Sequence, residues 1–225
     1  MRGFIFFLGL AWAFSAQGQS IVSAGLLPEV NVSYRWLGKW RITGQVESMQ
    51  QVWRKNEFSE LQGDYKYIRT DFTSVVSYKL NPDLTLAGGY LLRFSEGETI
   101  HRSIQQISSA YKKIGVRIGH RLRTDQTFEP TESFEFRLRY RFSAELPLNG
   151  LSINDREWYL IASTEFIGSV QQRDWDYEHR VLGSLGYNFN SSNKIETGLD
   201  YRLNRFLNDA PRHSVWWTIS YFLNL

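Results

Sequence analysis

Charged side chains recur at every second position in one segment of the chain. Arg137, Arg139 and Arg141 alternate with large apolar residues, and Glu135 precedes them in the same set. Buried arginines need carboxylate partners, whereas rings of arginine around a narrow pore favour anions. Two interpretations follow: a network of ion pairs that fills an interior, or a pathway or pocket for an anionic small solute.

The neighbouring segments carry charges that would join this set. Arg117, Arg121 and Arg123 precede it in the chain, and Glu165 follows it. If adjacent segments pair in one sheet, these side chains form a basic cluster with an acidic neighbour, which Asp71 and other carboxylates can help to neutralise. We therefore predict that a shared interior is lined by Arg117, Arg121, Arg123, Glu135, Arg137, Arg139, Arg141, Glu165, Glu196, Asp200 and Arg202.

A different chemistry, lipid hydrolysis, remains as an alternative. His101 and Ser103 are separated by one residue, so they would share a face of a strand, near its external end. Nucleophilic catalysis also needs an orienting third group and an oxyanion hole, which this spacing does not supply. The sequence has no phosphate-binding loop, metal-ligand spacing or nucleotide signature. We therefore assign no catalytic residue, no metal and no cofactor, and we expect no enzyme.

The arginine segment, residues 134–142, must be a β-strand. A period of two places its aromatic and charged sets on opposite faces, and a helix could not separate them because its neighbours lie only about 100° apart. A soluble strand seldom carries three consecutive arginines on its polar face. The pattern is typical of a strand with lipid on one side and a wet, charged lumen on the other.

The alternation recurs along the chain and predicts eleven strands. They cover residues 30–36, 40–53, 65–80, 84–94, 101–111, 116–123, 134–146, 158–166, 181–187, 195–204 and 215–225. Bacterial single-chain barrels usually have an even number of strands, so residues 19–29 would add a short twelfth, and ten is the other count we consider. The segment 101–111 alternates least cleanly, which suggests a bulge or a bias toward the lumen.

The connections and aromatic residues favour a membrane barrel. Short turns near positions 38, 82, 113 and 192 alternate with mostly longer, charged loops near 59, 97, 129, 174 and 210, and aromatic rings lie beside both sets. An open sheet edge cannot persist in lipid. We predict an all-β fold, a closed antiparallel up-and-down transmembrane β-barrel of about twelve strands. Its partners would be outer-membrane lipids and, through the apolar last strand, the barrel-assembly machinery.

The N-terminal residues and the composition restrict where in the cell we expect the protein. Residues 1–18 read as a signal peptide, with Arg2 before an apolar run and small residues near the cut. Residues 19–225 would then form the barrel domain in the outer membrane of a Gram-negative bacterium. The net charge of +3 is too small to argue for nucleic acid, and the absence of cysteine excludes disulfides. The soluble alternative is a secreted barrel or sandwich that binds a ligand.

Four short stretches carry a family resemblance. They are His101-Arg102 with Gln105-Gln106, Arg121-x-Arg123-x-Asp125-Gln126-x-Phe128, Arg137-x-Arg139-Tyr140-Arg141, and His179-Arg180 followed by Gly183 and Gly186-Tyr187. The chain resembles the exported proteins grouped as domain of unknown function 2490, over nearly the whole mature length. The resemblance implies an outer-membrane barrel and transfers no activity. We expect a narrow, largely filled channel or a structural or surface protein.

Overall fold

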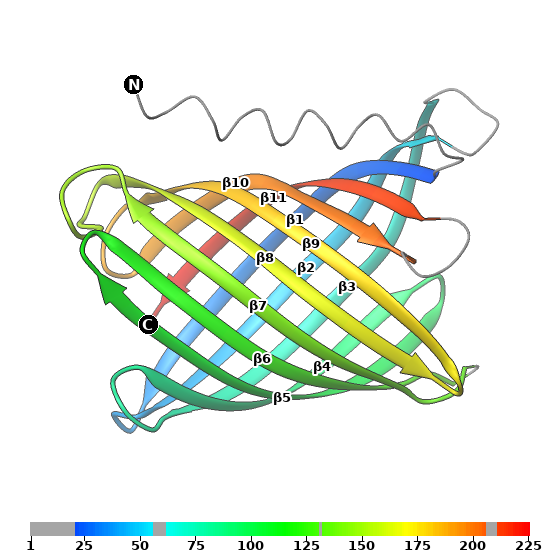
Figure 1. The fold of residues 1–225 in the computed structure, drawn as a ribbon, viewed down its shortest axis with the longest axis horizontal. Helices are drawn as coiled ribbons and strands as arrows, with labels where there is room; N and C mark the ends of the chain where they lie inside the picture. Colours follow the sequence, from blue (N-terminus) through cyan, green and yellow to red (C-terminus); the bar gives the residue numbers. More distant parts are fainter. Residues whose placement is uncertain (1–20, 56–61, 131, 206–210) are drawn as a thin grey trace.

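The computed structural model describes residues 21–55, 62–130, 132–205 and 211–225. Within these ranges the chain is all β (Figure 1). The strands are β1 (Ile21–Trp36), β2 (Trp40–Lys55), β3 (Gln62–Lys79), β4 (Leu84–Ser95), β5 (Glu98–Lys113), β6 (Val116–Phe128), β7 (Glu135–Pro147), β8 (Glu157–Gln171), β9 (Asp174–Asn188), β10 (Asn193–Asn204) and β11 (Arg212–Asn224). The described residues contain no helix that could cross a membrane. The predicted signal peptide, residues 1–18, lies outside the described residues.

The strands close into one barrel, as the sequence predicted. Each strand pairs antiparallel with the next along the chain, and β11 returns to pair with β1. That last pairing is parallel and runs from Ile21 opposite Arg212 to Ser33 opposite Asn224. The described strands number eleven, between the ten and twelve considered, because residues 21–29 lengthen β1 instead of forming a separate strand. An odd number of up-and-down strands makes the first and last run in the same direction, so the expected antiparallel pairing is wrong at this seam.

The two faces of the barrel differ in polarity. On β7, Leu138 and Tyr140 point outward and are 47% and 40% exposed. The side chain of Arg139 between them points inward and is only 11% exposed. Exposed apolar residues recur in this way on every strand, among them Trp36, Val46, Phe72, Tyr90, Ile107, Leu122, Tyr140, Trp158, Val181, Leu199 and Trp217. The barrel is therefore apolar outside and polar within.

The structure of β5 accounts for the weak alternation of polar and apolar residues in the segment 101–111. Its pairings with β4 and β6 contain no register shift, so the suggested bulge is absent. Arg102 and Ile104 point inward and are buried, while Ser103 and Gln105 lie on the opposite face. Both faces mix polar and apolar side chains, which hides the period of two. Register shifts occur elsewhere, at Ala24/Gly25 in the β1–β2 pairing and at Met49/Gln50 and Gln51/Trp53 in the β2–β3 pairing.

The connections correct two loop predictions. The loops expected near positions 97 and 174 are the two-residue turns Glu96-Gly97 and Gln172-Arg173. Glu96 and Gly97 have φ values of 48° and 88°, the left-handed backbone that two-residue hairpins require. Strand β9 starts at Asp174 because the charged residues from 174 to 180 alternate with aromatic ones and continue the ladder. The predicted alternation of short turns with long loops therefore fails at these two sites.

A small apolar cluster lies inside the barrel at the seam. Leu27, Met49 and Trp216 are each at most 5% exposed, and Ile68 packs against them. Gly25 leaves the room for this packing, because a Cβ atom there would lie 2.0 Å from the carbonyl oxygen of Gln50 and 2.8 Å from Cζ3 of Trp216. The cluster therefore depends on a residue without a side chain in β1.

We predict that Gly25→Ala destabilises the barrel. The added methyl group overpacks the seam, and overpacking typically costs roughly 1–3 kcal/mol. Gly44→Ala on the neighbouring strand is the control, because a Cβ atom there meets nothing within 4 Å. The free energy of unfolding of both variants is measured in detergent by urea titration, with tryptophan fluorescence as the signal. Equal stability of the two would show that Gly25 is not needed for seam packing.

Candidate functional site: the charged interior

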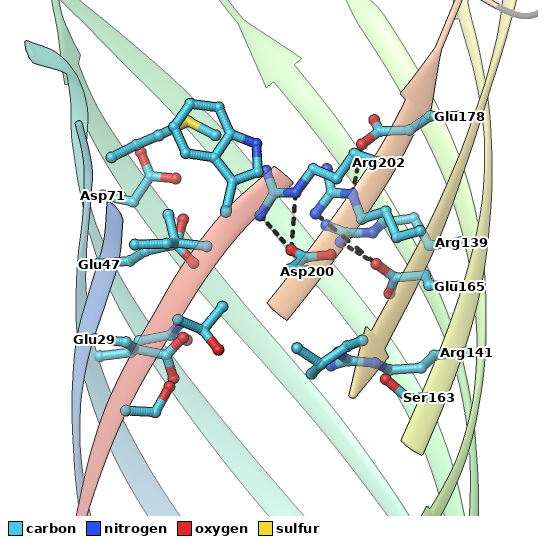
Figure 2. Close-up of a pocket in the computed structure, with 18 of the residues that line it drawn as sticks. Glu29, Glu47, Asp71, Arg139, Arg141, Ser163, Glu165, Glu178, Asp200 and Arg202 are labelled. Carbon is cyan, nitrogen blue, oxygen red and sulfur yellow. Dashed lines mark hydrogen bonds and ion pairs between the residues drawn. The ribbon is translucent and has the colours of Figure 1, made fainter. Parts of the chain in front are cut away.

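The interior holds a cavity of about 640 Å³ (Figure 2). Strands from all round the barrel contribute side chains to its wall, because every second residue of each strand points inward. Among the described residues that line it are the arginines Arg69, Arg93, Arg102, Arg121, Arg123, Arg137, Arg139, Arg141, Arg180, Arg202 and Arg212. The lining carboxylates are Glu29, Glu47, Asp71, Glu165, Glu178, Glu196 and Asp200.

Strand pairing brings like charges together on the basic side. Arg121 on β6 lies opposite Arg141 on β7, and Arg123 lies opposite Arg139. Like charges placed directly across a sheet destabilise it. The register therefore requires carboxylates close to these arginines.

Glu165 on β8 supplies the main compensation. Its two carboxylate oxygens each lie 2.7 Å from a guanidinium nitrogen, one of Arg121 and the other of Arg139 (Figure 2 shows the Arg139 contact). Arg180 on β9 approaches to 4.0 Å. One carboxylate that is only 3% exposed thus contacts arginines from three strands.

Asp125 on β6 is the second compensating group, and it is fully buried. One of its oxygens accepts from Nε of Arg123 at 2.5 Å, and the other lies 3.3 Å from Arg139. Arg139 therefore bridges Asp125 and Glu165. A continuous network results, from β6 through β7 to β8.

Further ion pairs lie on the rest of the wall, and two of them are the closest analogues of the Glu165 contacts. Arg93 donates two hydrogen bonds to Asp71, at 2.8 and 2.7 Å. Arg202 contacts Asp200 at 2.7 Å within β10 (Figure 2). Buried apolar side chains occupy other parts of the interior, namely Leu91, Ile100, Ile104, Tyr159 and Ile167. The interior is thus part ion-pair network, part apolar packing and part open cavity.

Arg141 differs from Arg121, Arg123 and Arg139 of the β6–β7 ladder because they have ion pairs. Its Nε atom, like those of Arg121 and Arg139, is buried and has no hydrogen-bond partner. Within the described part of the chain, no carboxylate lies within ion-pair distance of it, because Glu165 is already occupied by Arg121 and Arg139. A guanidinium group is therefore available at the cavity wall.

Most of the predicted interior residues meet in this cavity. The lining includes Arg121, Arg123, Arg137, Arg139, Arg141, Glu165, Glu196, Asp200 and Arg202. Arg117 lies apart, with its side chain 61% exposed and 4.0 Å from Glu145 near the β5–β6 turn. Glu135 lies toward the other end of β7, where it accepts from Arg137 at 2.8 Å.

Sequence reasoning missed several interior charges. Arg180 could have been assigned to the interior, because side chains alternate along β9 and its neighbour Val181, like Leu185, faces outward. Asp125 could have been assigned to the interior in the same way, because it lies two positions after Arg123 in β6. Arg102 was hidden by the mixed pattern of β5, and Glu29 fell in a segment whose pattern was too weak to interpret. Only the register of the closed sheet places the last two in the interior.

His101 and Ser103, the pair considered for lipid hydrolysis, both lie on the outer face of β5. Nδ1 of His101 lies 2.6 Å from the hydroxyl oxygen of Tyr90. The hydroxyl of Ser103 donates to the side-chain carbonyl of Gln126. Each side chain is thus engaged with a neighbouring strand. Among the described residues, no group of three or more His, Asp or Glu side chains could hold a metal ion.

The fold and site define a class: a closed β-barrel with an apolar exterior and a charged interior. The family comparison is more specific. The model for "Protein of unknown function (DUF2490)" matches residues 25–214, which is most of the chain, so the protein belongs to this family. No curated protein and no solved structure matches the chain.

We predict that Glu165→Gln destabilises the barrel by roughly 3–5 kcal/mol, because loss of one buried charge leaves its partners uncompensated. Glu96→Gln is the control: Glu96 pairs with Lys66 at the surface, with its side chain 63% exposed. An exposed pair contributes at most about 1 kcal/mol. Urea unfolding in detergent compares the two variants. A Glu165→Gln barrel as stable as the control would show that Glu165 is not the hub of the network.

Proposed function

We propose that the protein is an outer-membrane β-barrel whose charged interior forms a narrow passage for small anions. The observation that carries this proposal is the reversed polarity of the barrel. Apolar side chains cover its outer face while arginines and carboxylates fill the interior. A soluble barrel has the opposite arrangement, with its apolar side chains in the core.

The exterior and the strand lengths both suit a bilayer. Soluble monomers rarely expose contiguous apolar patches larger than a few hundred Å², and here apolar side chains are exposed on all sides of the barrel. Strands of 12 to 18 residues exceed the roughly 9–11 that cross a bilayer when tilted. Closure leaves no open edge in the lipid. Export would use the leader at residues 1–18, and the barrel-assembly machinery would recognise β11.

The charge of the lining favours anions. Among the described lining residues, eleven arginines face seven carboxylates, which leaves an excess of positive charge. Arg141 is free of carboxylate partners and can bind a passing anion. Because ion pairs and apolar side chains occupy much of the interior, the passage is narrow and its conductance small.

The membrane assignment predicts where the mature chain is stable. Without its leader, the protein should fold into lipid vesicles, resist protease there, and aggregate in buffer without detergent, because water would contact the apolar exterior. In both conditions, circular dichroism measures folding and sedimentation measures aggregation. A folded monomer in plain buffer would refute the membrane proposal.

The anion assignment predicts a small, anion-preferring current in planar bilayers. The reversal potential in a salt gradient should show the preference, and Arg141→Gln should reduce it because one unpaired charge leaves the wall. Arg173→Gln, in the exposed β8–β9 turn, is the matched control and should leave the preference unchanged. No current at high voltage, or a preference that Arg141→Gln does not alter, would contradict the proposal.

A further inference from the structure

The charges that line the cavity are separated across it. Glu29, Glu47 and Asp71 are consecutive cross-strand partners on β1, β2 and β3, so they form a row of carboxylates. Arg139 and Arg141 lie on the opposite wall (Figure 2). A row of carboxylates and a pair of arginines therefore face each other across the cavity (Figure 2).

The acidic row is only partly neutralised. Asp71 accepts two hydrogen bonds from Arg93, and the Nε atom of Arg69 lies 3.4 Å from it. Glu47 has a looser contact, 3.5 Å from Arg69. Glu29 accepts from the amide of Asn31, and within the described residues no cation lies within ion-pair distance of it. A carboxylate without a cationic partner thus faces the cavity on this side.

The opposite wall carries a cation that likewise has no ion-pair partner among the described residues. The Nε atom of Arg141 has no hydrogen-bond partner, and Figure 2 shows Arg141 and Glu29 on opposite sides of the cavity. The buried hydroxyl group of Ser163 lies beside Arg141 in the same view. A cation and an anion that lack ion-pair partners among the described residues therefore face one cavity of about 640 Å³, across which their charges attract each other.

We propose that the preferred solute of this cavity is a small free zwitterion, with an ammonium group and an acidic group such as a carboxylate. The ammonium group would contact Glu29 and Glu47, and the acidic group would contact Arg141. Both unpaired protein charges are then neutralised at once, which neither a simple anion nor a simple cation achieves. This inference rests on the passage proposed above and names the class of solute that uses it.

Solute efflux from proteoliposomes tests the inference with matched probes. Taurine is a zwitterion, and isethionate is the anion in which a hydroxyl group replaces its ammonium group. Choline serves as the cation. Wild-type protein should release taurine about fivefold faster than isethionate, the factor expected for one additional ion pair in a hydrated site, and should release choline slowest.

Two variants assign the two charges. Glu29→Gln should remove the lead of taurine over isethionate, since the ammonium group loses its partner while the anion contact remains. Arg141→Gln should slow both sulfonates. The control Arg173→Gln should change neither rate. Protease resistance in the same vesicles shows that each variant is folded.

The outcomes separate this inference from the proposal on which it rests. If isethionate passes as fast as taurine, and Glu29→Gln changes nothing, the zwitterion inference is wrong while the anion passage stands. If none of the probes and no chloride pass through folded wild-type barrels, the passage itself is refuted, and the inference fails with it.

Discussion

The structure depends on holding many arginines inside a barrel without leaving their charges uncompensated. Pairing of β6 with β7 places arginine opposite arginine at two successive inward positions, and this arrangement is tolerable only because Asp125 and Glu165 lie within reach. Glu165 contacts arginines of β6 and β7, and Arg139 bridges it to Asp125. The network therefore ties three strands together through their inward side chains, in addition to the backbone ladder.

The closing seam imposes a second constraint. With an odd number of strands, β1 and β11 must run parallel. A register shift in the β1–β2 pairing lies at Ala24/Gly25, beside this seam. Trp216 of β11 packs there against Leu27 and Met49, so the interior is apolar beside the seam. The opposite wall carries the arginine ladder. This difference between the two sides gives the cavity its asymmetric lining.

The proposed functions follow from these two features together. The exterior has the polarity of a surface in contact with lipid, which leaves the interior as the place where a polar solute can be held. Most interior charges are already paired, and those charges stabilise the barrel. Arg141 and Glu29 line the cavity and have no ion-pair partner among the described residues, so they are two groups that a solute can contact.

The sequence by itself determined the strands, their faces and most of the charged lining. A period of two is a local property, so Arg121, Arg139 and Glu165 could be assigned to one face from their immediate neighbours alone. The same rule located Arg202 and Asp200. It failed for β5, where both faces are mixed, and for the start of β9, where a charged run resembled a loop.

Only the tertiary structure decided the strand count, the parallel direction of the closing pair and the pairing of charges. Whether β1 is one long strand or two short ones depends on its fit to β11, which lies at the other end of the chain. Which arginine shares Glu165 depends on the register of three strands, and so does the isolation of Arg141. These properties arise from contacts between residues far apart in sequence, and local alternation of side chains carries no information about them.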